Sequence, residues 1–244
     1  MKITIVSELS SKLIYSDGET FQGSFDPIHK KISFESDKLY VDSKFRDIKI
    51  LDDGNILIKF LFNGEEGSLE KELLLEKGKS LIIEDKKGKW DKDLWETVYR
   101  DFKIELNYKT KEVDFDENNI KLQIHEKGYT SCGEGFKNGD VEETVNAKIG
   151  SVYEAKLMID NRYTLNVTKI NGSKISIESI YYYCDNHGKI NELKDSFEIN
   201  ETFLYYETRS GGYATRYDHE SWYWSIEVEL VIDGSTKFAI KKGY

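Results

Sequence analysis

The densest group of chemically active side chains lies between Glu207 and Glu220, around a Gly211-Gly212 pair that predicts a hairpin turn. Arginine, histidine and carboxylate groups on one rigid hairpin suit anion binding or acid–base chemistry. No spacing here fixes a reaction type, so we interpret the segment as a binding surface. A solvated hairpin with paired charges is the plain alternative. The candidate binding residues are Arg209, Tyr213, Arg216, Tyr217, Asp218, His219 and Glu220.

One short spacing is typical of metal ligands. Cys184 and His187 supply a sulfur and an imidazole, half of a zinc site that Cys132 or His219 would have to complete. The same segment also reads as a turn that follows a buried strand, with the cysteine acting as a small apolar side chain. Structural zinc sites bring paired motifs at both ends. We therefore predict no metal and no cofactor, and retain Cys184 and His187 only as weak candidates.

Aromatic side chains form the other concentrated feature, in runs at 181–183, 205–206 and 222–224. Neighbours in a strand point to opposite faces. Trp222 and Trp224 continue the apolar face of the strand that follows, so Tyr223 is predicted on the outer face. Tyr182 and one residue of the Tyr205-Tyr206 pair are expected to join it. Outward tyrosines among acids suit a recognition surface, whereas ordinary strand composition is the alternative.

Common catalytic signatures are missing from the sequence. It contains no nucleophile elbow, no phosphate-binding glycine loop and no paired-histidine zinc helix. His29 and His125 have no chemical neighbour in the sequence that distinguishes them from surface residues. We therefore expect binding rather than catalysis, with an enzyme of unknown class acting through the 207–220 hairpin as an alternative.

The elements that must position these residues are strands. Apolar residues alternate with polar ones along 102–108, 120–125 and 222–232, which is typical of strands with one buried and one wet face. Asn171-Gly172 is the strongest hairpin signal. Only 68–75 and 91–100 also fit short helices. We predict an all-β fold of antiparallel sheets, with few or no helices and two sandwich-like or barrel-like units.

The alternation stops around 128–140, a stretch with four glycines. We predict an N-terminal unit over 1–127, a linker or long loop over 128–140, and a tyrosine-rich C-terminal unit over 141–244; a single large β fold is the alternative. Tyrosine content supports the division, because residues 1–128 hold 4 of the 16 tyrosines.

Charge and composition limit the partners. The net charge of −10 and the scattered basic residues argue against nucleic acid and anionic membranes. No export signal opens the sequence and there are two cysteines, so we expect a cytoplasmic protein. We predict a non-enzymatic module, an inhibitor or immunity-type protein, that binds a basic partner protein; a carbohydrate-binding sandwich is an alternative.

Overall fold

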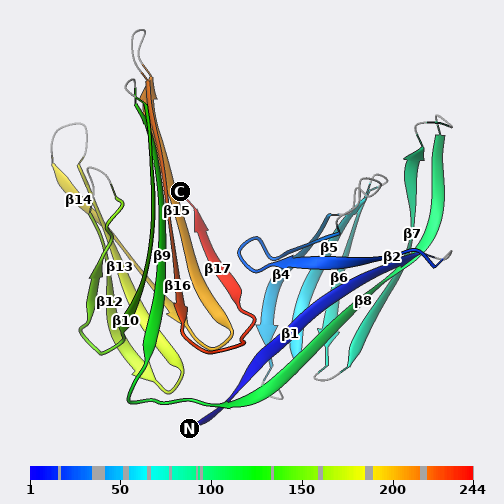
Figure 1. Cartoon of the computed structure of the whole chain (residues 1–244), viewed down its shortest axis with the longest axis horizontal. Helices are drawn as coiled ribbons and strands as arrows, with labels where there is room; N and C mark the ends of the chain where they lie inside the picture. The colour runs from blue at the N-terminus through cyan, green and yellow to red at the C-terminus, as the bar shows by residue number, and fades with distance from the viewer. Residues whose placement is uncertain are drawn as a thin grey trace. The chain divides into compact units, whose positions relative to one another are not determined.

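The computed structural model describes residues 1–15, 18–34, 42–51, 55–64, 67–76, 79–91, 93, 96–132, 135–158, 162–184, 189–214 and 219–243. Every regular element within these ranges is a β-strand, which confirms the all-β prediction (Figure 1). None of them forms a helix able to cross a membrane. The chain divides into two compact units, an N-terminal unit of Thr4–Glu112 with Gly234–Thr236, and a C-terminal unit of the remaining residues.

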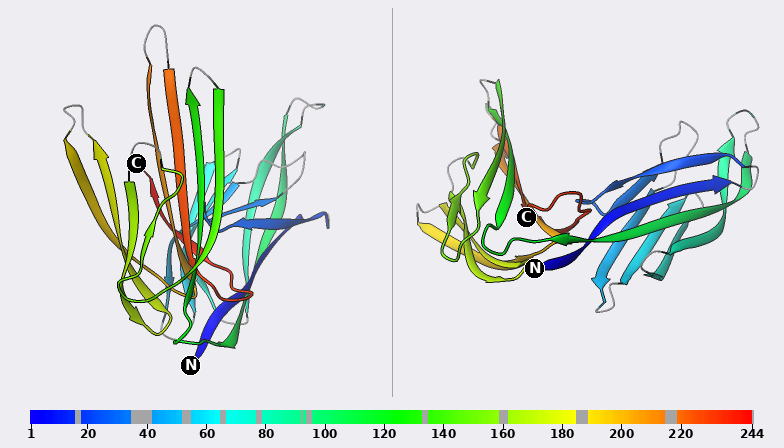
Figure 2. Two further views of the ribbon diagram at one scale, coloured as in Figure 1. Left: turned by 60° about the vertical axis from the view of Figure 1, so that its left-hand side comes forward. Right: turned by 60° about the horizontal axis from the view of Figure 1, so that its bottom comes forward.

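The N-terminal unit is built on one eight-stranded sheet of order β6-β5-β4-β3-β2-β1-β8-β7. Its curvature, visible in Figure 2, lets a single sheet bury one of its faces, which carries Ile5, Leu13, Ile32, Ile58 and Phe60. The strands are β1 (Lys2–Tyr15), β2 (Thr20–Asp26), β3 (Lys31–Phe34), β4 (Asp42–Ile50), β5 (Ile56–Gly64), β6 (Gly67–Leu75), β7 (Ser80–Asp91) and β8 (Glu96–Asp114).

The C-terminal unit has two sheets, of order β10-β9-β16-β15-β17 and β11-β12-β13-β14. Among the described strand pairs of this unit, only β15–β17 is parallel. The strands are β9 (Lys121–Cys132), β10 (Gly135–Asn146), β11 (Val152–Glu154), β12 (Arg162–Asn171), β13 (Lys174–Cys184), β14 (Ile190–Ile199), β15 (Phe203–Ala214), β16 (His219–Leu230) and β17 (Phe238–Gly243).

The two sheets of the C-terminal unit bury their facing sides against each other. Trp224, Ile226 and Val228 on β16 are almost fully buried, as their alternation predicts. The Trp224 ring lies 4.8 Å from the ring of Tyr163 on β12, centroid to centroid, so the two sheets meet directly here. The predicted Asn171-Gly172 hairpin is also present, with Asn171 opposite Lys174 and Gly172 at φ 59°.

Residues 128–140, expected as a linker or long loop, lie instead largely in the paired strands β9 and β10. Gly128 and Gly139 stand opposite each other in this pair. A Cβ atom added to either would lie 3.2 Å and 2.7 Å, respectively, from side-chain atoms of Leu157. These glycines therefore make room for Leu157 on the sheet. The division between the units falls between Glu112 and Val113, within β8.

Candidate functional site

One buried polar network of the C-terminal unit surrounds Glu207. Its Oε2 accepts hydrogen bonds from the hydroxyls of Tyr163 and Tyr205, each at 2.6 Å, and its Oε1 lies 2.6 Å from Arg209 Nη2. The Arg209 guanidinium in turn lies 3.9 Å from the centre of the Tyr181 ring. Burial and the charge of Glu207 raise the pKa of Tyr163 well above its ordinary value, so its hydroxyl stays protonated as a donor. This network ties the two sheets together.

Arg209 is therefore not a surface residue. Its side chain is 8% exposed and is held by Glu207 and Tyr181, whereas the sequence suggested an outward hairpin arginine. The reason is the strand period, because residues 205, 207 and 209 share the inward face of β15. An inward arginine that already has a carboxylate partner is poorly suited to capture an external anion.

The other residues predicted on this hairpin are only partly described. Tyr213 pairs with Glu220, and Ala214 with His219, where β15 meets β16. The structure describes the backbone of these residues but not the side chains of Tyr213, His219 and Glu220, while Arg216, Tyr217 and Asp218 lie outside the described residues.

The weak metal candidates are also only partly described. Cys184 ends β13 opposite Ile190 and Cys132 ends β9, with side chains that are not described, and His187 lies outside the described residues. Among the described residues, no group of three or more histidine, cysteine or acidic side chains is placed to hold a metal ion.

A second buried carboxylate belongs to Glu126 on β9, which is fully buried. It accepts hydrogen bonds from the Tyr153 hydroxyl, from the backbone N–H groups of Lys156 and Leu157 at 3.0–3.2 Å, and from Trp224 Nε1 at 3.2 Å. All these donors are neutral, and they fix the segment after β11 against the inner face of the sheet. The sequence could have indicated this burial, because Glu126 continues the inward-facing alternation of Leu122 and Ile124.

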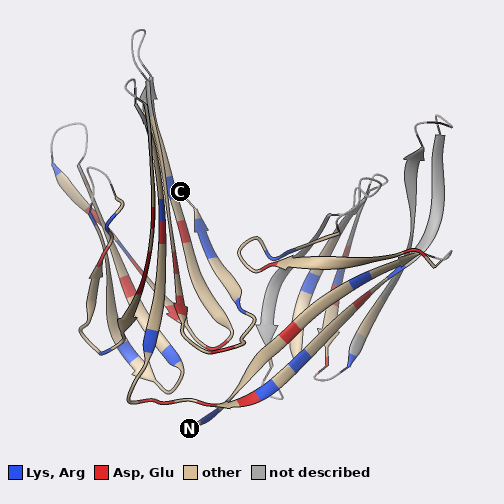
Figure 3. Ribbon diagram, in the orientation of Figure 1, with Lys and Arg blue, Asp and Glu red and all other residues tan. Residues whose placement is uncertain are grey.

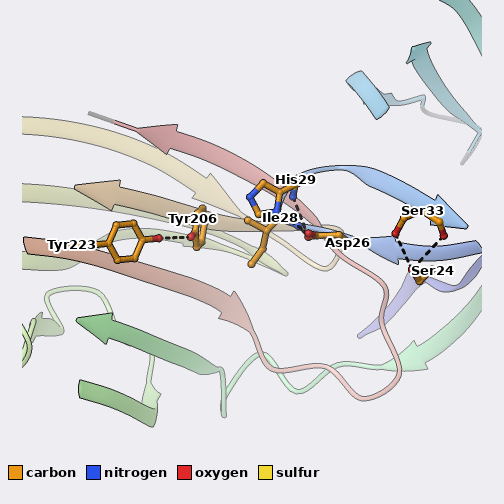
Figure 4. Close-up of polar contacts among 7 residues, drawn as sticks. All are labelled: Ser24, Asp26, Ile28, His29, Ser33, Tyr206 and Tyr223. Atoms are coloured by element: carbon orange, nitrogen blue, oxygen red, sulfur yellow. Dashed lines mark hydrogen bonds and ion pairs between the residues drawn. The ribbon is translucent and has the colours of Figure 1, made fainter. Parts of the chain in front are cut away.

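Tyrosines gather on the opposite, outward face of the five-stranded sheet. The Tyr206 and Tyr223 hydroxyls lie 3.0 Å apart, as drawn in Figure 4. Tyr129 on β9 stands directly opposite Tyr223 in the register. Tyr223 is 39% exposed. We call Tyr129, Tyr206 and Tyr223, together with Glu227 on the same side of β16, the tyrosine face.

The tyrosine face matches the sequence expectation for Tyr223 and identifies Tyr206 as the outward member of its pair. Tyr182 does not join it, because β13 belongs to the other sheet of the unit. Its ring instead lies 5.9 Å from the Arg162 guanidinium carbon. The sequence reasoning missed Tyr129, since the alternation along β9 was not extended into the glycine-rich stretch.

Glu227 places a half-buried carboxyl with a raised pKa on the tyrosine face. It pairs in the register with Tyr206 on one side and His125 on the other. Burial and the nearby charge of Glu229 raise the pKa of Glu227, and the positive charges of His125, Lys237 and Lys127 only partly offset them. Figure 3 shows both signs of charge along these strands. A further cation near Glu227 would stabilise its ionised form.

The two histidines whose side chains the structure describes, His29 and His125, have carboxylate partners that the sequence did not reveal. His125 Nε2 lies 2.6 Å from Asp140 Oδ1 on the neighbouring strand β10. In the N-terminal unit, His29 Nδ1 lies 2.7 Å from Asp26 Oδ2 (Figure 4). Burial opposes ionisation of Asp26, but hydrogen bonds from His29 and Ile28 outweigh it and lower the pKa of this carboxyl. Both contacts explain these histidines as partners of exposed carboxylates.

Comparison with protein-family models, curated proteins and solved structures finds no match for this chain.

Proposed function

We propose that the chain is a non-enzymatic, cytoplasmic protein-binding module that uses the tyrosine face to hold a basic partner protein, as an inhibitor or immunity-type protein would. The observation that carries this proposal is Glu227, a carboxylate with a raised pKa set between Tyr206 and His125 on a sheet face. A lysine or arginine from a partner would stabilise the ionised form of Glu227.

The tyrosines would provide most of the contact area. Tyrosine and arginine are enriched where single residues dominate binding energy, because a tyrosine ring buries a large area at a small entropic cost. A partner arginine could stack on the ring of Tyr223 while it pairs with Glu227. The net charge of −10 would speed the encounter with a basic surface and make it sensitive to salt.

The test is site-specific photo-crosslinking of the full chain in its native host. A benzophenone amino acid replaces Tyr223 in one variant, Tyr182 in a second and the 72% exposed Ile190 on β14 in a control. We expect one partner with a basic surface to crosslink from position 223 and not from 190. Equal labelling from all three positions, or no protein adduct at 223, contradicts the proposal.

The purified pair then gives a quantitative check. Tyr223→Ala should weaken binding by about 30-fold, the effect of losing about 2 kcal/mol at an interface anchor. Tyr182→Ala should leave the affinity within about twofold if the tyrosine face alone is used. Retention of a glycan by the wild-type chain, with loss in Tyr223→Ala, would instead favour a carbohydrate-binding role.

A further inference from the structure

Between its two sheets the C-terminal unit has a largely apolar cavity of about 290 Å³, open to solvent at the end where Asn146 and Val152 are exposed. Leu122, Ile124 and Val145 contribute from β9 and β10, while Leu165, Val167 and Ile177 contribute from β12 and β13. Protein interiors are close-packed, and voids much larger than a water molecule are few. A space of this size between two sheets is therefore unusual and is a candidate ligand site.

Away from its open end, the lining of the cavity disfavours water and ions. None of its lining residues carries a charged side chain, and its aliphatic residues offer water no hydrogen-bonding partners. Polar groups enter the lining from Asn146 at the end of β10, from Ser151 just before β11 and from Tyr153 within β11. An apolar molecule with one polar group would match this division.

The Tyr153 hydroxyl sets the chemistry of the polar end. It donates its proton to the buried carboxylate of Glu126, so its oxygen lone pairs remain available to accept a hydrogen bond. Burial and the charge of Glu126 raise the pKa of Tyr153 above its ordinary value, which keeps the hydroxyl in its neutral form. A ligand with a neutral O–H donor fits this end, whereas an anion would face Glu126 without a compensating cation.

We propose that this cavity binds a small, uncharged, apolar alcohol or phenol, with its hydrocarbon part between the sheets and its hydroxyl toward Tyr153. The volume sets the size. It is about twice that of an apolar cavity of about 150 Å³ that holds benzene, so about ten to twelve carbon atoms fit. This site lies on the inward side of the sheets and does not depend on the tyrosine face.

The experiment titrates the full chain with 2-naphthol and with naphthalene-2-sulfonate, which has the same ring system but carries a charge. We expect saturable 2-naphthol binding with a dissociation constant on the order of 10–100 µM, the affinity that its about eleven heavy atoms allow. The sulfonate should bind at least tenfold more weakly. Equal affinity for the two probes, or no saturation by 2-naphthol, overturns the proposal.

Two variants locate the binding. Val167→Phe places a ring inside the cavity and should weaken 2-naphthol binding at least tenfold. Val231→Phe places the same ring at a 41% exposed position outside the lining and should leave the affinity unchanged. Retained binding in Val167→Phe contradicts the proposal.

Methyl NMR of the wild-type chain provides a readout that needs no variant. Bound 2-naphthol should shift the methyl signals of Leu122, Ile124, Val145, Leu165, Val167 and Ile177. If Val167→Phe fails to fold, this map decides the outcome. Shifts centred on these residues support the site, and shifts centred elsewhere overturn it.

Discussion

Glu207 and Glu126 flank Ile226 in one row across β15, β16 and β9, so two buried carboxylates share the inward face of the five-stranded sheet. Their charges are accommodated differently. Glu207 has a cation, Arg209, and two tyrosine hydroxyls. The described donors to Glu126 are all neutral, two of them backbone N–H groups. This difference predicts different responses to mutation.

Removal of Arg209 should destabilise the fold, because it leaves the buried carboxylate of Glu207 without its cation. Arg209→Met leaves Glu207 ionised in the interior without its cation, and we expect a loss of about 3–5 kcal/mol in the free energy of unfolding. The double variant Glu207→Gln/Arg209→Met removes both charges and should recover most of that loss. Hydrogen exchange of β12 and β15 peptides in denaturant measures this unit separately. A double variant as unstable as the sum of the single variants would show that the pair is not coupled.

Glu126→Gln should loosen the segment that follows β11. In the variant, the glutamine amide places an N–H group where one carboxylate oxygen of Glu126 now accepts hydrogen bonds. At least one buried donor therefore loses its acceptor. We expect a loss of about 1–3 kcal/mol and faster amide exchange at Lys156 and Leu157. Glu154→Gln is the matched control, since its exposed pair with Arg162 should contribute less than about 1 kcal/mol. Unchanged exchange at Lys156 would argue against this role of Glu126.

Strand periodicity accounts for what the sequence revealed about this fold. The alternation of residues 222–232 correctly placed Trp224 inside and Tyr223 outside, because one buried face imposes a period of two. The same rule carried through Glu126, Glu207 and Arg209 would have placed these charged residues inside. Their charge suggested a surface position instead. The hydrogen-bond and ion-pair partners that offset the cost of burying them are visible only in the three-dimensional structure.

The exact boundary between the units was harder to predict, since tyrosine content distinguishes the units but no tyrosine lies between Tyr108 and Tyr129 to locate it. β8 is one continuous strand to Asp114, and the boundary at Glu112 lies within it. The glycines of 128–140 suggested a linker, but Gly128 and Gly139 are needed for the approach of Leu157, a residue distant in sequence. A glycine required by a tertiary contact looks the same in sequence as one required by a turn.

Gly23 in β2 predicts a sensitive position in the N-terminal unit. It pairs with Ser11 and Phe34 in the register. A Cβ atom there would lie 2.8 Å from Ile32 Cγ2 and 2.9 Å from Phe34 Cε1, and closer still to Ser11 Oγ. Gly23→Ala should therefore destabilise this unit by about 1–3 kcal/mol, as overpacking does.

Hydrogen exchange of the β1–β3 peptides measures the effect of Gly23→Ala, and those of β15 and β16 should remain unchanged. Gly243→Ala serves as the control, because the nearest atom to its added Cβ would be Thr208 Oγ1 at 3.3 Å on an exposed strand end. It should cost less than about 1 kcal/mol. Equal losses of stability in the two variants would show that the close contacts around Gly23 do not make this position more sensitive than an exposed one.

Glu227 links the stability of the fold to the proposed binding. Its pKa in the folded chain is raised, chiefly by burial and by Glu229. The folded state thus holds this proton more tightly than the unfolded state does. The stabilisation from protonation is complete below the unfolded pKa and is lost as the pH rises through the folded pKa.

At neutral pH, Glu227→Gln should therefore raise the free energy of unfolding, by about 0.5 kcal/mol given the partial exposure of the side chain. The advantage over the wild type should shrink as the pH falls toward the carboxyl range. The same substitution should weaken binding of a basic partner, because it removes the charge that a partner cation would pair with. Thermal melts of both chains between pH 4 and 8 give the first result, and titration with the crosslinked partner gives the second. A variant less stable than the wild type at pH 7 would show that Glu227 is already compensated within the fold, which removes the reason for a cationic partner there.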